Sequence, residues 1–99
     1  MSELENKGVS EIKRLCGIYG ISPIELSLYL QITWTRIYEI LSGRRRITPD
    51  TDIRLCHFFN LAYGHFAKLQ LEYDLQVSEN ELADSLERLP IVDRTVKAL

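Results

Sequence analysis

The sequence lacks the features that mark membrane-spanning or secreted proteins. No apolar run approaches the roughly 20 residues that a helix needs to cross a bilayer. The first eight residues, MSELENKG, are polar and acidic, which is unlike the basic and then apolar start of a secretory signal. We therefore expect a cytoplasmic protein without a membrane partner.

Cysteine and histidine are too few and too scattered for a metal site. Cys16 and Cys56 stand alone, without a CxxC pair, and both fall on the expected inward faces of helices. We expect reduced thiols in the core. Neither His57 nor His65 lies four residues from a cysteine or from the other histidine, and zinc would need further ligands. The chain also lacks a Ser–His–Asp or Cys–His set and a glycine-rich phosphate loop, so we predict no enzyme activity, no metal and no cofactor.

The remaining composition indicates one globular domain with an uneven charge distribution. Ninety-nine residues, 45% of them apolar, suffice for one core without disulfides or metal. The net charge of −2 does not by itself suggest nucleic acid. Residues 33–60 nevertheless hold five cations and three anions, whereas residues 61–99 hold four cations and seven anions. The middle of the chain is thus suited to phosphate contacts, and the acidic end is either solvated or faces a basic partner.

Residues 22–43 have the pattern of two short helices with a tight joint. Ser22 and Glu25 form a capping-box pattern, Thr33 is a second candidate N-cap, and Gly43 suits a left-handed helix end. So short a joint makes the helices cross steeply, as in a helix-turn-helix, although a plain helical hairpin has the same spacing. In a helix-turn-helix, the second helix presents its outer face to the DNA major groove. That face would carry Trp34, Thr35, Arg36, Tyr38 and Glu39.

The rest of the chain reads as further helices without strand alternation. We predict a disordered segment over residues 1–9, helices over 10–19, 23–30, 34–42, 49–59 and 63–76, and a motif spanning 22–42. Over 77–99, the Ser78 and Glu81 capping box predicts a separate short helix that Pro90 stops. This is an all-α domain over residues 10–76 with a short C-terminal helical tail. Its expected inward residues are Ile12, Leu15, Cys16, Tyr19, Leu26, Tyr29, Leu30, Ile37, Ile40, Leu41, Ile53, Cys56, Phe59, Phe66, Leu69 and Tyr73.

A family resemblance covers residues 20–75. It is carried by Leu26, Leu30, Ile32, Ile37, Glu39 and Ile40, by the run GRRRITPD from Gly43 to Asp50, by Ile53-Arg54-Leu55 and Phe59, and by Leu69-Gln70 and Tyr73-Asp74-Leu75. In these residues the chain resembles the HigA-type addiction-module antitoxins, a branch of the Cro/lambda-repressor-like (XRE) helix-turn-helix proteins. The resemblance implies a five-helix lambda-repressor-like DNA-binding domain. It also implies a homodimer that binds a palindromic operator, represses its own toxin–antitoxin operon and neutralises a RelE-like ribonuclease toxin.

The resemblance also assigns roles to residues. Base-reading residues in the major groove would be Thr33, Trp34, Thr35, Arg36 and Glu39. Phosphate contacts would come from Ser22, Tyr38, Arg44, Arg45 and Arg46. Arginine paired with guanine is the commonest specific contact, and guanidinium forks suit phosphate geometry.

Three departures from the family pattern favour an alternative function. Pro23 stands where the family has a glutamine that helps to hold phosphate and base, and Gln31 stands where a glycine is usual. Gln31 must then adopt positive φ or a different turn. Trp34 would either stack on a sugar or thymine methyl group, or lie buried against the helix at 49–59. With the acidic balance, these residues favour a protein-binding module on the same fold with weak or no DNA binding.

Overall fold

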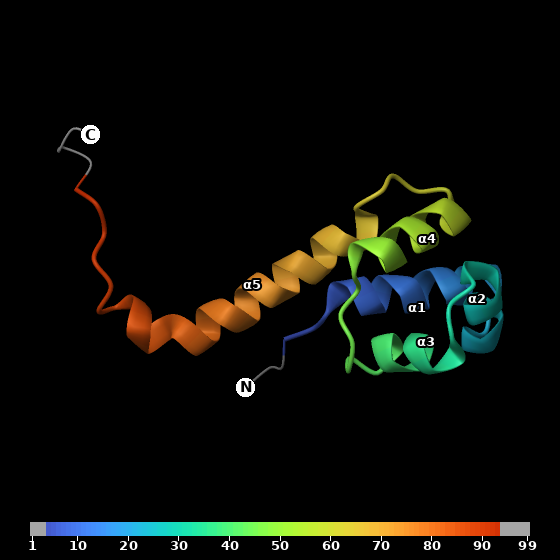
Figure 1. Ribbon diagram of the computed structural model, residues 1–99, viewed down its shortest axis with the longest axis horizontal. Coiled ribbons are helices and arrows are strands. Elements are labelled where there is room, and N and C mark those ends of the chain that lie inside the picture. Colours follow the sequence, from blue (N-terminus) through green and yellow to red (C-terminus); the bar gives the residue numbers. More distant parts are fainter. Residues whose placement is uncertain (1–3, 94–99) are drawn as a thin grey trace.

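The computed structural model describes residues 4–93, and these form five helices with no strand (Figure 1). The helices are α1 (Lys7–Tyr19), α2 (Pro23–Leu30), α3 (Trp34–Leu41), α4 (Pro49–Phe59) and α5 (His65–Leu86). Helices α1 to α4 surround a core with the first turns of α5, and the rest of α5 projects away from this body (Figure 1). The all-α, five-helix prediction is confirmed.

The core draws on every helix. Its fully buried side chains include Ile12, Leu26, Ile40, Leu55, Cys56 and Phe66. Three of the predicted inward positions are wrong, namely Tyr19, Tyr29 and Ile53, whose exposed fractions are 62%, 55% and 45%. Leu69 and Tyr73 are half-buried and lie outside the core. The other predicted positions are confirmed. Tyr19 and Tyr29 lie on the rim of the core instead. Their rings contact Phe59 and Phe58, with ring centroids 6.0 and 5.1 Å apart respectively.

The predicted disorder over residues 1–9 is wrong from Asn6 onward, and residues 1–3 lie outside the described part of the chain. Helix α1 begins at Lys7, and Asn6 is its N-cap, accepting hydrogen bonds from the backbone N–H groups of Gly8 and Val9 at 3.0 and 3.3 Å. The Asn6 amide also donates to Gln70 in α5 at 3.1 Å. The polar composition of this segment conceals a cap whose second partner lies 64 residues away.

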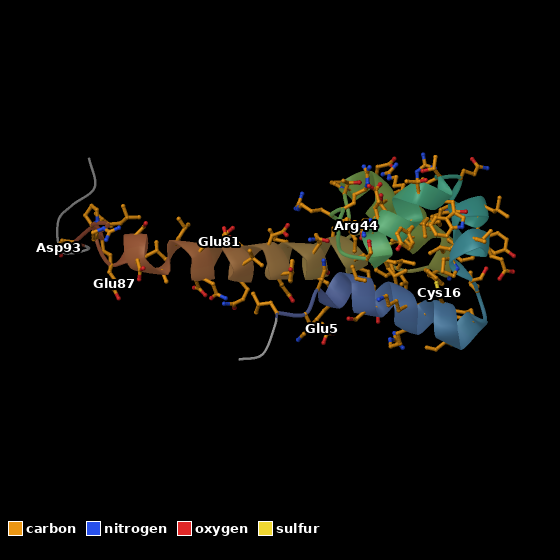
Figure 2. All side chains as sticks on the ribbon, turned by 90° about the horizontal axis from the view of Figure 1, so that it is seen from below. Glu5, Cys16, Arg44, Glu81, Glu87 and Asp93 are labelled. Carbon is orange, nitrogen blue, oxygen red and sulfur yellow. The ribbon has the colours of Figure 1, made fainter. Side chains whose placement is uncertain are left out.

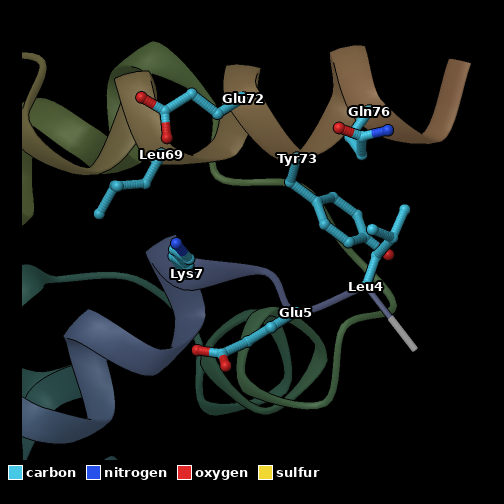
Figure 3. Close-up of a pocket in the computed structure, with 7 residues that line it drawn as sticks. All are labelled: Leu4, Glu5, Lys7, Leu69, Glu72, Tyr73 and Gln76. Carbon is cyan, nitrogen blue, oxygen red and sulfur yellow. The ribbon is translucent and has the colours of Figure 1, made fainter. Parts of the chain in front are cut away.

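The residues before α1 also lie against α5. A pocket of about 250 Å³ lies between the two segments. Among the residues that line it, Leu4 lies beside the ring of Tyr73 (Figure 3). The pocket is lined by Leu4, Glu5, Lys7, Leu69, Glu72, Tyr73 and Gln76. The described N-terminal residues therefore belong to the packed domain.

The predicted break between two C-terminal helices is also wrong, since α5 runs without interruption for 22 residues. A capping box starts a new helix only where the preceding helix has ended. Residues 65–86 contain neither glycine nor proline, the residues that most often end a helix. Gln76 instead donates forward to Glu79 and Asn80 within the helix, at 3.3 and 3.1 Å. The helix ends at Leu86, before Pro90.

Helix α5 takes its cap from α4. Gly64 precedes α5 with a φ of +100° and offers no capping side chain. The buried carboxylate of Asp52 accepts hydrogen bonds from the backbone N–H groups of Gly64, Phe66 and Ala67, at 2.6, 2.9 and 2.8 Å. One α4 side chain thus satisfies three N–H groups at the start of α5, which have no partner within the helix.

The two cysteines lie in and beside the core, Cys56 buried and Cys16 half-buried. Both cysteines are free thiols, and burial raises the pKa of each. Within residues 4–93 no three His, Cys, Asp or Glu side chains come together as a metal site would need. Over the same range, no helix combines the length and apolarity that crossing a membrane takes.

Candidate nucleic-acid interface

Local hydrogen bonds set the positions of α2 and α3. The Ser22 hydroxyl accepts from the Glu25 N–H at 3.1 Å, and the Glu25 carboxylate accepts from the Ser22 N–H at 2.9 Å. This capping box lowers the pKa of Glu25 below its usual value. At the joint, Gln31 adopts a φ of +56°, as its place in the turn requires. Thr33 then caps α3 by accepting from the Arg36 N–H at 3.1 Å.

The outer face of α3 carries a continuous row of aromatic and cationic groups. Trp34 and Tyr38, four residues apart, have exposed fractions of 44% and 47%, and their ring centroids lie 5.0 Å apart. The guanidinium carbon of Arg44 lies 5.8 Å from the centre of the Tyr38 ring. We call these three side chains the aromatic row. Trp34 is therefore not buried against α4, and Ile37 and Ile40 fill the opposite, inward face of α3.

Arg36 leaves this face and turns toward the N-terminus of α4. One of its terminal nitrogens donates to Thr51 at 2.7 Å, lies 3.2 Å from a carboxylate oxygen of Asp50, and lies 3.4 Å from the hydroxyl of Thr48. Its side chain is only 28% exposed, and its Nε is buried without a partner. The predicted base-reading role does not fit this conformation, because the guanidinium fastens α3 to α4.

Glu39 and the loop arginines after α3 point in different directions. Glu39 pairs with Arg45 at 3.1 Å, and Arg46 pairs with Asp74 of α5 through its Nε at 2.8 Å. Arg46 also holds the pKa of Asp74 below its usual value. Arg44 has no carboxylate partner among residues 4–93, and Figure 2 shows it on the body of the domain, well away from Glu81 on α5 and from Glu87 just after it. It is the one loop arginine that can meet a phosphate without first releasing a carboxylate.

A buried side chain of α5 positions the loop. The carbonyl oxygen of Gln70 accepts from the backbone N–H of Ile47 at 3.0 Å, and its amide donates to Asp74 at 3.0 Å. Gln70 is only 2% exposed. Sequence reasoning used Gln70 as part of a family pattern and did not assign it this role, because a lone glutamine within a helix does not reveal a contact 23 residues away.

Part of the chain is similar in sequence to a known protein. No protein-family model matches the chain. Virulence-associated protein I of Dichelobacter nodosus is 34% identical over 62 residues, which are 63% of this chain but only 57% of that protein. This chain therefore spans less than two thirds of that relative's length.

Solved structures match over nearly the whole chain. A HigA-family addiction-module antidote protein from Coxiella burnetii matches with a TM-score of 0.81 and 26% identity, over 93% of this chain and all of that one. The Pseudomonas aeruginosa antitoxin HigA, solved with the higBA promoter, matches with a TM-score of 0.81 and 23% identity, over 91% of this chain and all of that one. PA4674 of the same organism, solved with 18-base-pair operator DNA, gives 0.81 and 22%, over 92% and 98%. The resemblance to HigA-type antitoxins is thus confirmed.

Proposed function

We propose that this chain is a DNA-binding antitoxin that represses its own toxin–antitoxin operon. The observation that carries the proposal is the bare outer face of α3, where Trp34, Thr35 and Tyr38 are exposed beside the three loop arginines. A helix-turn-helix presents this face to the major groove. The similar Pseudomonas aeruginosa HigA was solved with promoter DNA, which supports the same use here.

We assign DNA contacts from the position of each side chain on α3 and in its flanking loops, and from the contacts that the side chain already makes. Thr33, Trp34 and Thr35 lie at the N-terminal end of α3, the end that meets base edges in this motif. Ser22 and Arg44 would contact phosphates beside the helix, and Tyr38 lies between Trp34 and Arg44 on its outer face. Arg45 and Arg46 reach phosphates when Glu39 and Asp74 release them, and Glu39 can then accept from a base. Arg36 holds α3 on α4 rather than reading a base.

A homodimer would explain the exposed leucines of α5. Leu71, Leu75, Leu82 and Leu86 are 45–61% exposed, and their spacing places them on one side of the helix, away from the buried Phe66 and Gln70. If a second copy covers this stripe, binding to a palindromic operator requires the two α3 helices to lie about 34 Å apart, one turn of DNA. We expect Leu75→Glu with Leu82→Glu to halve the molar mass measured by light scattering and to weaken operator binding, whereas Glu79→Gln should do neither.

Antitoxin action needs a second partner. The resemblance implies a small basic RelE-like ribonuclease. The projecting part of α5 and its C-cap carry four exposed carboxylates, Glu79, Glu81, Asp84 and Glu87, of which Figure 2 labels Glu81 and Glu87. This acidic surface suits a basic partner. Co-expression with the neighbouring open reading frame tests whether this acidic surface binds its product. The two proteins should form a complex in low salt, and the complex should weaken when three of the four carboxylates are replaced by amides.

The DNA proposal is tested by a gel shift with the DNA upstream of the gene. We expect specific binding, with affinity that falls as salt rises. Arg45→Ala with Arg46→Ala should weaken binding to all sequences and flatten the salt slope by roughly 0.9 for each lost phosphate contact. An unchanged slope would remove these arginines from phosphate contact. Binding to a protein partner without any operator binding would instead select the alternative, a protein-binding module, which the carboxylate-paired arginines favour.

A further inference from the structure

We infer that Trp34 and Tyr38 read thymine methyl groups in the major groove, so that sequence specificity rests on apolar contact and not on an arginine–guanine pair. This inference rests on the proposed DNA-binding function and names the base edge that the site recognises. It also differs from the roles that the family resemblance implies, in which Arg36 reads a base and Tyr38 contacts a phosphate.

The polar candidates on α3 are already engaged. Arg36 is fastened to Thr51 and Asp50, and its Nε is buried. Glu39 is held by Arg45, and the Thr33 hydroxyl caps the helix. Of the predicted base-reading residues, Thr35 is therefore the one polar side chain left without such a contact, whereas Trp34 presents a large ring to solvent.

The dimensions of the aromatic row fit stacked base pairs. One helical turn rises about 5.4 Å, and consecutive nucleotides on one strand rise about 3.4 Å. The two rings, with centroids 5.0 Å apart, therefore form one apolar surface that covers one to two base steps. Thymine is the base that presents an apolar group there, its C5-methyl, and apolar side chains are the groups that contact it.

The row also has a direction. Trp34 is the first residue of α3, at the end that enters the groove most deeply in this motif. Arg44 lies at the other end, over the Tyr38 ring, in the loop that flanks the groove. The row thus leads from base edges at Trp34 to the phosphate backbone at Arg44, which is the order in which the two kinds of contact occur across a groove.

The test compares two forms of one duplex. The upstream DNA is first footprinted, and the protected duplex is then synthesised with thymidine or with deoxyuridine, which lacks only the C5-methyl. Loss of one buried methyl group should weaken binding about fourfold. If a dimer buries one methyl group in each half-site, the loss should be about sixteenfold. Trp34→Ala with Tyr38→Ala should bind both duplexes equally. Tyr63→Ala, which removes an aromatic ring 62% exposed between α4 and α5, should keep the wild-type preference.

Each result separates the inference from the function it rests on. If the wild-type protein bound both duplexes specifically and with equal affinity, the thymine inference would be overturned and the DNA-binding proposal would stay intact. Retained discrimination in the double variant would also overturn it, because the methyl groups would then be read elsewhere. No binding of either duplex, with capture of a protein partner through Trp34, would reject both. The wild-type comparison needs no variant, so it does not depend on how the substitutions affect folding.

Discussion

Replacing Asp52 should destabilise the domain more than any other single change in a carboxylate of α4. Its side chain is 2% exposed and accepts from three backbone N–H groups at the start of α5. Asp52→Ala removes all three acceptor contacts. It leaves a buried donor at Phe66 and part-buried donors at Gly64 and Ala67 without their partner.

The magnitude follows from these contacts. A hydrogen bond to a charged group contributes about 1.5–3 kcal/mol, and a buried donor left without a partner costs about 1–3 kcal/mol. Because the three contacts share one carboxylate, their costs do not simply add, and we expect a total loss of about 3–5 kcal/mol. Each kcal/mol lowers Tm by about 4–8 °C in a domain of this size. Asp52→Ala should therefore lower Tm by roughly 12 °C or more.

Thermal unfolding followed by circular dichroism at 222 nm measures this loss, and urea titration gives the free energy independently. Asp50→Ala is the matched control, since Asp50 lies in the same first turn of α4 but is exposed and pairs only with Arg36 and Arg54. We expect it to cost about 1 kcal/mol or less. If Asp52→Ala melted within a few degrees of wild type, the assignment of Asp52 as the cap of α5 would be refuted.

Two further predictions concern paired carboxylates. Asp74→Asn should free Arg46 while it keeps an oxygen that accepts from Gln70. Operator affinity should then rise severalfold, and the salt dependence of binding should steepen by roughly 0.9 in slope. An unaltered slope would show that Arg46 does not reach phosphate. Glu11 has a pKa lowered from 4.5 to about 2, chiefly by Arg14 and then by His65, so its stabilising effect is complete above about pH 4.5 and is lost as pH falls toward 2. Glu11→Gln should lower the free energy of unfolding by about 1 kcal/mol at pH 6, a value that allows for the exposure of Arg14. Urea unfolding at pH 6, 4 and 3 measures the effect, and the difference between wild type and variant should shrink as pH falls.

The sequence predicted those parts of the fold that depend on local chemistry. The starts of α2 and α3 follow from Ser22 and Thr33, because each cap contacts backbone within three residues. The error at the N-terminal end has the opposite cause, because the cap of α1 is secured by Gln70, which no short window of sequence contains. At the C-terminal end, the Ser78 and Glu81 pattern predicts a helix start although it lies inside a continuous helix.

The candidate site shows the same division. The exposed face of α3 was predicted correctly in outline, since Ile37 and Ile40 set which side is buried. The orientation of Arg36 was not, because a guanidinium on a long side chain can reach either solvent or a neighbouring helix. Its choice depends on Thr51, which is 1% exposed and 15 residues away. Helical periodicity assigns a residue to a face, but it cannot say where a flexible side chain ends.

The pairing of the arginines bears on how selective such a surface can be. Nonspecific DNA affinity comes almost entirely from cations that neutralise phosphates. Here Arg36, Arg45 and Arg46 each lie against a carboxylate, and only Arg44 of the nearby arginines is unpaired among residues 4–93. Each pair must break before its arginine can bind a phosphate, whatever the sequence of the DNA. Carboxylate pairing therefore lowers the affinity for all sequences by a similar factor, and discrimination between sequences must come from the exposed rings.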